Sequence, residues 1–257
     1  MKDKYLKWAI FAISLFIICL IASAWSISTG EIHFKLGSLF GIIREADSME
    51  YEILKNIRIP RLLLAFSIGG ALSLSGAVLQ GIYRNPLVEP YTLGISGGAA
   101  LGVAAIVVTG LQMSIGAFIL PLAGFLGALA TIFLVYFLSM RKGGIEINRM
   151  LLIGVMISFV ASSAMMFFMA VTSVENMHGI VFWMMGSLDE PNINLIYIML
   201  SISLLGLVTT YFFARPLNAL RLGETKALHL GINTSFTIKI LFLTCSLLAG
   251  ASVAVVG

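Results

Sequence analysis

Long apolar runs separated by short polar stretches are the dominant pattern of this chain. At about 1.5 Å per helical residue, each run can cross a hydrocarbon core of roughly 30 Å. In lipid, helices satisfy their backbone hydrogen bonds within one segment, and the sequence has no strand-length alternation. It therefore predicts an all-α fold, a polytopic transmembrane helix bundle. The seven predicted spans are Trp8–Ile27, Leu62–Leu79, Leu93–Leu111, Ile115–Met140, Met150–Val171, Ile193–Phe213 and Phe236–Gly257.

Composition supports a membrane protein and excludes a soluble globule. Hydrophobic residues make up 59% of the chain and charged residues 11%, against about 45–50% and about 25% in soluble domains. The net charge is +4, but the basic residues are scattered between the apolar runs. The predicted contact is therefore membrane lipid and not nucleic acid. Cys19 and Cys245 each lie inside a predicted span, so neither a disulfide framework nor a metal site is expected.

Basic residues at the span ends predict the orientation of the chain. With the N-terminus inside, the inner segments hold ten Lys and Arg and the outer segments hold five, so we expect a cytoplasmic N-terminus. The first span, which follows Lys7 and passes Ala22-Ser23-Ala24, also resembles a cleavable signal peptide. A retained anchor is favoured because its apolar length reaches a full membrane width.

The predicted spans carry no deeply placed Asp, Glu, Arg or His. Proton-coupled and ion-coupled transporters usually need such groups, although backbone-coordinated sodium keeps an ATPase-independent secondary transporter as an alternative. The sequence also lacks a Gly-x-x-x-x-Gly-Lys-Ser/Thr loop for binding ATP. Active transport would therefore need ATP bound by a separate subunit. We expect no enzyme activity, no catalytic residue and no resident cofactor.

Two sets of small residues at four-residue spacing predict close helix packing. In lipid, such ridges let helix backbones approach each other, so both helices are expected inside the bundle. The sets are Ala65, Gly69, Ser73 and Ala77 in the second span, and Gly94, Gly98 and Gly102 in the third.

The polar stretch after the second span predicts a rigid cytoplasmic turn. Pro86 and Pro90 block helix continuation, and Asn85 precedes the first of them. From its position alone, Asn85 is a turn former.

Arg58 and Arg61 lie three residues apart at the outer end of the second span, and Pro60 suits a first helical turn. Two guanidinium groups on one face could receive acidic residues of an outer partner. Interfacial anchoring, or pairing with Glu50 and Glu52, is the alternative.

Residues 214–235 form an inner segment with an apolar set in an otherwise polar stretch. Gly223 and Gly231 are suited to end helices, so we expect two short helices that present this set to a soluble partner. An interfacial helix resting on lipid is the alternative. The set consists of Leu217, Leu220, Leu222, Ala227 and Leu230.

Three elements in this order resemble the FecCD-type permease family, which imports iron-siderophores, haem and cobalamin. The first element joins Arg58-Ile59-Pro60-Arg61 to Ser75-Gly76, Gln80, Asn85-Pro86-Leu87, Pro90, Gly94 and Gly98. The second is Phe182–Leu188, with its Trp-x-Met-Gly-Ser character, and the third is Leu217–Gly231. The resemblance implies the permease subunit of an ATP-binding-cassette importer in the plasma (inner) membrane of a prokaryote. It also implies a cytoplasmic ATPase subunit, an extracytoplasmic substrate-binding protein and a second permease subunit as partners.

The resemblance further implies roles for single residues. Arg58 and Arg61 would dock the binding protein, and Asn85, Pro86 and Leu87 would lie near the cytoplasmic gate, bordered also by the loop 141–149. Coupling to the ATPase would fall to residues 214–235, through Leu217, Leu220, Leu222, Gly223, Glu224, Ala227, Leu230 and Gly231.

The chain departs from the family in length. Family members have roughly ten spans with internal symmetry, whereas this chain reaches Gly257 in its seventh. We therefore treat residues 1–257 as one transmembrane permease domain, incomplete at the C-terminus. A truncated, non-transporting remnant is the alternative to a permease for an iron(III)-siderophore or a related chelate such as haem or cobalamin.

Overall fold

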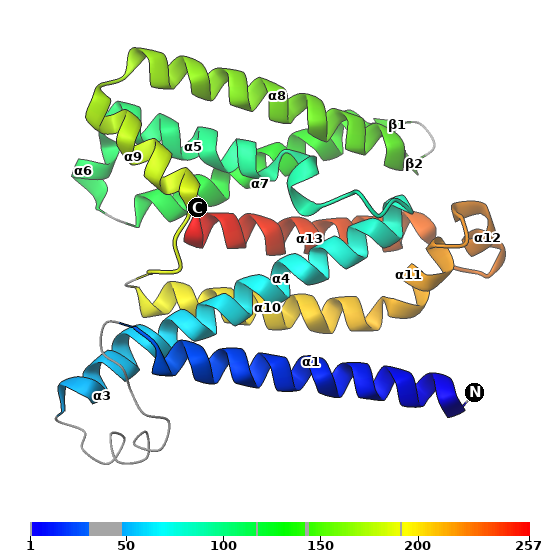
Figure 1. The fold of residues 1–257 in the computed structure, drawn as a ribbon. Coiled ribbons are helices and arrows are strands. Elements are labelled where there is room, and N and C mark those ends of the chain that lie inside the picture. Colours follow the sequence, from blue (N-terminus) through cyan, green and yellow to red (C-terminus); the bar gives the residue numbers. More distant parts are fainter. Residues whose placement is uncertain (1, 31–47, 117, 142–143, 191) are drawn as a thin grey trace. The chain divides into compact units, whose positions relative to one another are not determined.

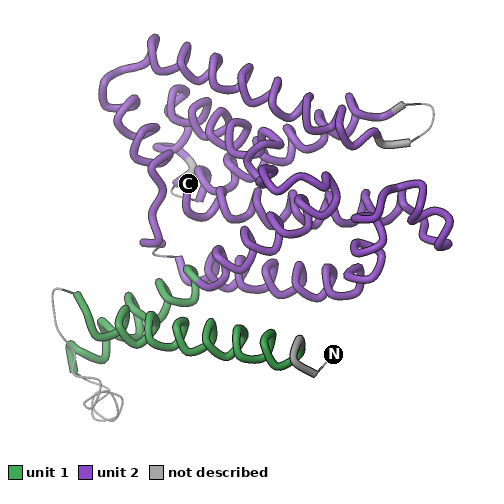
Figure 2. Tube along the Cα trace, turned by 45° about the vertical axis from the view of Figure 1, so that its right-hand side comes forward, with its two compact units in different colours: residues 1–65 green, residues 66–257 purple. Residues whose placement is uncertain are grey.

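The computed structural model describes residues 2–30, 48–116, 118–141, 144–190 and 192–257. The chain divides into two compact units, residues 1–65 and residues 66–257 (Figure 2).

The first unit is helical. The Ser48 hydroxyl accepts a hydrogen bond of 3.2 Å from the Tyr51 amide and thereby caps the second helix. Leu54 is buried, and Ile27 and Tyr51 pack against it. The elements are α1 (Lys2–Ser28), α3 (Met49–Ile53), the π-helical turn η2 (Leu54–Arg58) and the start of α4 (Ile59–Tyr83).

Pro60 is the second residue of α4, but helical structure also precedes it. The helical segments from Met49 to Tyr83 are continuous over 35 residues, so the expected start of the span near Leu62 was wrong. Proline has no N–H, and its ring crowds the carbonyl four residues back. The chain accommodates it by widening the preceding turn, where the Ile59 amide donates to the Leu54 carbonyl five residues back.

The second unit is a helix bundle with one minimal β-ladder (Figure 1). In this ladder Met140 pairs with Ile145 and Arg141 with Gly144, antiparallel. After α4, the elements are η3 (Pro90–Leu93), α5 (Ile95–Thr109), α6 (Leu111–Ile115), α7 (Ile119–Ser139), β1 (Met140–Arg141), β2 (Gly144–Ile145), α8 (Ile147–Val171), α9 (Val174–Met185), α10 (Ile193–Phe212), α11 (Ala214–Leu220), α12 (Glu224–His229) and α13 (Thr234–Val256).

The all-α fold class is confirmed, and the main differences from the predicted spans are the early start of the second and the length of the third. Within the described ranges, six helices are long and apolar enough to cross a membrane, and α5 is a shorter apolar helix of 15 residues. The predicted third span was too long because Gly94 and Gly110 both take left-handed backbone angles, with φ of 80° and 71°, and bound α5 on either side. Helix α9, which has 12 residues, was not predicted from the sequence.

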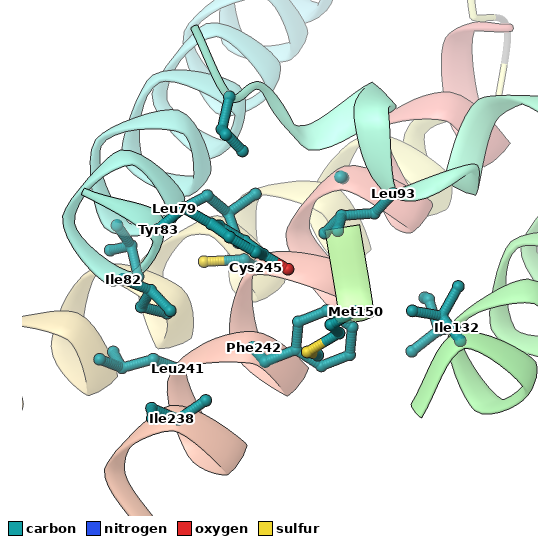
Figure 3. Packing of buried hydrophobic residues seen from close by; sticks show 14 of the residues in the cluster. Leu79, Ile82, Tyr83, Leu93, Ile132, Met150, Ile238, Leu241, Phe242 and Cys245 are labelled. Atoms are coloured by element: carbon teal, nitrogen blue, oxygen red, sulfur yellow. The ribbon is translucent and has the colours of Figure 1, made fainter. Parts of the chain in front are cut away.

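Helix α13 supplies the centre of the second unit. It packs against α5, α7 and α10, and Phe242 is 1% exposed. Figure 3 shows Phe242 and Cys245 of α13 among side chains from several other elements. These neighbours include Leu79, Ile82 and Tyr83 of α4, Leu93 of η3, Ile132 of α7 and Met150 of α8.

The small residues of the third span pack as predicted. A Cβ placed on Gly102 would lie 2.5 Å from the Ala123 carbonyl oxygen of α7, and one on Gly98 would overlap Thr131. In the other direction, a Cβ on Gly127 would overlap the backbone of Gly98. Helices α5 and α7 therefore meet backbone to backbone.

The small residues of the second span do not pack in this way. Gly69, Ser73 and Ala77 are exposed, and a Cβ on Gly69 would meet nothing within 4 Å. The expectation of a buried ridge was wrong because α4 buries another face, which carries Ala71, Ser75, Val78 and Leu79. We refer to Gly69, Ser73 and Ala77 as the exposed ridge of α4.

Candidate functional site

The loop after α4 is a tight turn, as predicted. Arg84 ends the helix with a φ of 52°, which is unusual for a residue with a side chain. The Asn85 side-chain oxygen accepts a hydrogen bond of 3.0 Å from the Leu87 amide, and the Gln80 amide nitrogen donates to the Pro86 carbonyl at 3.1 Å. Leu87 is left 85% exposed at the tip. Asn85 therefore acts structurally as a turn former.

Residues 214–235 contain the two predicted short helices, α11 and α12. Gly231 follows α12 with a φ of 79°. Its amide donates to the Leu228 carbonyl at 2.9 Å, and the Ile232 amide donates to the Ala227 carbonyl at 3.1 Å. This pair of bonds is a Schellman motif, so Gly231 ends the helix as expected.

Gly223 and Glu224 begin α12. Gly223 is its N-cap residue, with a φ of 115°. The Glu224 carboxylate accepts a hydrogen bond of 3.4 Å from the Thr234 hydroxyl, which belongs to the first turn of α13. The start of α12 is thereby linked to the start of α13.

The predicted apolar set is divided between two surfaces. Leu220 and Ala227 are buried, and Leu217 lies over Gly81 of α4. By contrast, Leu222 is 60% and Leu230 64% exposed. The expectation that all five residues form one docking surface was wrong, since three of them hold α11 and α12 to the bundle.

The exposed leucine set consists of Leu222, Leu228 and Leu230. Leu228, which is 54% exposed, was not in the predicted apolar set. Its neighbour Ala227 is buried, and adjacent helical residues point about 100° apart. Because Ala227 was assigned to the outward face, Leu228 was not. The sequence feature that could have identified Leu228 is that it is the larger apolar side chain of these two neighbours.

The structure brings the loop after α4 and residues 214–235 together. A Cβ on Gly223 would lie 3.6 Å from a guanidinium nitrogen of Arg84. Between α4, the loop and α11 lies a hollow of about 460 Å³, which we call the arginine hollow. Its lining residues are Ala77, Gln80, Gly81, Arg84, Asn85, Pro86, Leu217, Asn218 and Arg221.

Arg58 and Arg61 are not presented as a matched pair. Arg58 is half-buried, and its guanidinium donates a hydrogen bond to the Ile27 carbonyl near the end of α1. Arg61 is exposed on α4. Residues three apart share a face in a regular α-helix, but the π-turn η2 ends at Arg58 and changes the angle between the two side chains.

Some predicted features lie outside the described residues. Lys35 and Arg44, which entered the orientation argument, are among them, as are residues 142 and 143 of the predicted gate border 141–149.

Trp183 of α9 borders two further hollows, of about 300 and 410 Å³. The smaller one is also lined by Asp189 and Glu190, and the Glu190 carboxylate accepts a hydrogen bond of 2.8 Å from the Asn192 amide. The larger one includes Tyr91. Burial, followed by the charge of Glu89, raises the pKa of Tyr91 above its ordinary value.

A bundle of apolar helices, six of which among the described residues are long enough to cross a membrane, is typical of a multi-pass membrane protein. The chain belongs to the FecCD transport family, whose model matches residues 15–257. This family consists of permeases of ABC transporters, which are not enzymes. The chain is accordingly an importer permease of the inner membrane.

Individual relatives support this family. An uncharacterized ABC transporter permease protein of Bacillus subtilis is 34% identical, with 90% of this chain and 68% of the relative covered. A hemin transport system permease protein of Yersinia pestis is 33% identical, covering 95% and 72%. A vitamin B12 import system permease protein of Salmonella paratyphi A is 31% identical, covering 100% and 74%.

A solved structure has the same fold. It is an inward-facing conformation of a metal-chelate type ABC transporter, with a TM-score of 0.80 and 28% sequence identity. The match covers 95% of this chain and 75% of the other.

Proposed function

We propose that this permease carries an iron(III)-siderophore or a related metal chelate, such as haem or cobalamin, into the cell. The printed names of the relatives support this substrate class, since they include hemin, vitamin B12 and metal-chelate transporters. The observation that carries the proposal is the family match over residues 15–257. The chemistry common to these cargoes is a metal enclosed by a bulky organic ligand.

The energy would come from a cytoplasmic ATPase that docks on α11 and α12. The exposed leucine set supports this role, because apolar side chains on short helices fit hydrophobic grooves of a soluble partner. The excess of Lys and Arg in the inner segments supports a cytoplasmic N-terminus, and with this orientation α12 would lie on the same side. An extracytoplasmic substrate-binding protein would deliver the chelate near Arg61, and a second permease subunit would complete the passage.

Uptake by proteoliposomes tests the proposal. The full chain, its ATPase subunit and the binding protein would be reconstituted together, and entry of radiolabelled ferric siderophore, haem or cobalamin measured. We expect one of these chelates to accumulate in the proteoliposomes only when ATP is supplied to the ATPase subunit and all components are present. The control is an ATPase subunit with its nucleotide-binding lysine replaced. Uptake without ATP would instead indicate a secondary transporter, and no uptake with any chelate would indicate a remnant.

The proposed orientation predicts a specific labelling pattern. In a background lacking Cys19 and Cys245, Thr225→Cys on exposed α12 should react with a membrane-impermeant maleimide only after the cells are permeabilised. Glu50→Cys on α3, at the proposed outer side, should react in intact cells and serves as the matched control. Labelling of Thr225→Cys in intact cells would contradict the proposed orientation and indicate the opposite one.

A further inference from the structure

The turn η3, which ends the loop after α4, lies directly on the backbone of α8. A Cβ placed on Gly154 of α8 would lie 2.8 Å from the Leu93 Cα atom and 3.0 Å from the Thr92 carbonyl oxygen. In the other direction, a Cβ on Gly94 would lie 3.0 Å from the Gly154 carbonyl oxygen. Backbone atoms cannot rotate away as side-chain atoms can, so a larger residue at position 154 would displace η3. Glycine weakens a helix relative to alanine, and this close approach explains its presence inside α8.

The contact continues along one face of α8. Ser158 lies four residues beyond Gly154, and its hydroxyl donates a hydrogen bond of 3.1 Å to the Gly154 carbonyl. Ala161 follows three residues later, and a Cβ on Gly97 of α5 would lie 3.2 Å from the Ala161 Cβ. Residues at spacings of three and four share a helix face. This face, formed by Gly154, Ser158 and Ala161, receives η3 and the start of α5, and we call it the η3 seat.

The turn is enclosed by other helices of the second unit as well. Leu93 of η3 and Met150 of α8 are each 1% exposed and belong to the same buried cluster (Figure 3). Thr131 of α7 lies close by, since a Cβ on Gly94 would be 3.2 Å from its methyl carbon. The turn also packs against α13. Three helices, α7, α8 and α13, therefore hold η3 in place.

The tip of the same loop is held less tightly. Leu87 is 85% exposed, and Asn85 and Pro86 line the arginine hollow. By contrast, Pro90 and Leu93 of η3 are buried. Only residues 88 and 89 separate Leu87 from η3, so a displacement of η3 would also displace the tip.

We propose that Gly154 is a positioning residue for the loop after α4, because it seats η3 on α8 so that the two move as one body. Both expected borders of the cytoplasmic gate are then attached to the same helix. Residues 85–87 belong to the loop that η3 ends, and residues 144–149 lead into the start of α8. A movement of α8 would therefore move both borders together. This consequence for gating rests on the proposed function, whereas the contact between η3 and α8 does not.

Hydrogen exchange of the purified full chain, followed by mass spectrometry, tests the seat. Several amides of residues 89–98 are hydrogen-bonded within that segment, so their exchange reports whether η3 is in place. We expect exchange there to be about tenfold faster in Gly154→Ala, because overpacking would loosen the seat. Gly206→Ala is the matched control, since its Cβ would overlap Leu248 in the contact between α10 and α13. It should leave the exchange of residues 89–98 as in the wild type.

Two results of this measurement would overturn the proposal. One is exchange in Gly154→Ala that equals exchange in the wild type, since the added methyl group would then displace nothing. The other is equally fast exchange of residues 89–98 in both glycine variants, because that would indicate a general loss of packing and not a seat for η3. The measurement needs neither ATP nor chelate.

A disulfide tests the joint movement and does not depend on how Gly154→Ala folds. In a background lacking Cys19 and Cys245, Gly97→Cys with Ala161→Cys places two thiols across the contact, where the Cβ separation of 3.2 Å is close to that of a disulfide. We expect the bond to form on mild oxidation and chelate uptake by the reconstituted transporter to stay unchanged, because the tied parts already move together. The wild-type chain, oxidised in the same way, is the control.

The outcomes of the disulfide experiment separate the two proposals. Failure of the bond to form would contradict the contact between α5 and α8. Uptake that is lost on oxidation and restored by reduction would overturn the joint movement, because it would show that the two elements must separate. Uptake that is absent before and after oxidation, in the wild type as well, would contradict the proposed function and leave the exchange result intact.

Discussion

Replacing Gly127 with alanine is expected to destabilise the bundle by about 3 kcal/mol, at the upper end of the usual cost of overpacking. The added methyl group would overlap the backbone of Gly98, and backbone atoms cannot rotate away as a side chain can. Helices α5 and α7 would have to separate, and the contacts around them would be lost. Thermal unfolding of the purified chain in detergent, followed by circular dichroism, measures the effect as a lower Tm.

Gly76→Ala is the matched control for this prediction. Gly76 is also a helical glycine of a membrane-spanning segment, but a Cβ there would meet nothing within 4 Å. Its replacement should leave the Tm unchanged or raise it slightly, because alanine favours helix over glycine. If both variants unfold at the same temperature, the close approach of α5 and α7 is not a source of stability.

Replacing Leu222 and Leu230 with aspartate is expected to abolish capture of the ATPase subunit. Burial of a leucine contributes about 1.5–3 kcal/mol, so loss of two predicts binding at least about a hundredfold weaker. The new carboxylates would add the cost of burying charge in the interface. Both side chains point away from the bundle, so the fold should persist. Pull-down with the tagged ATPase subunit measures the loss.

Thr225→Asp provides the charge control. Thr225 is an exposed polar residue of α12, so this change adds a carboxylate without removing apolar surface. Capture should be close to wild type for Thr225→Asp. Leu228→Asp, a position identified only from the structure, should weaken capture as the other leucine variants do. Normal capture by the double leucine variant would contradict ATPase docking on this surface and favour a helix resting on lipid.

The long helices could be predicted from the sequence because their length is set by the membrane. Helix α10 begins at the predicted residue Ile193, and α13 begins two residues before the predicted Phe236. The deviations occur where a backbone angle decides the structure. Gly94 ends the turn η3 and starts α5 late, and Pro60 produces a π-turn where a helix start was expected. The apolar character of the sequence alone predicts neither the late start of α5 nor the π-turn.

The candidate site could be predicted as separate pieces but not as one place. The tight turn at Asn85 and the helix end at Gly231 follow from local residue preferences, and both are present. Their arrangement depends on tertiary contacts, such as Leu217 over Gly81 and Arg84 beside Gly223. Those contacts also decide which leucines are buried. Residue type could not distinguish Leu220, which is buried, from Leu222, which is exposed.

The connection between α12 and α13 is short and hydrogen-bonded, so the two helices have little freedom to move independently. Only residues 230–233 separate α12 from α13, and the Ile232 amide is bonded back to Ala227. The Glu224–Thr234 hydrogen bond spans the same gap from the other side. A displacement of α12 would therefore also move the start of α13, because no flexible linker separates the two helices. Since α13 packs against α5, α7 and α10, a small displacement of α12 would be transmitted to the centre of the second unit.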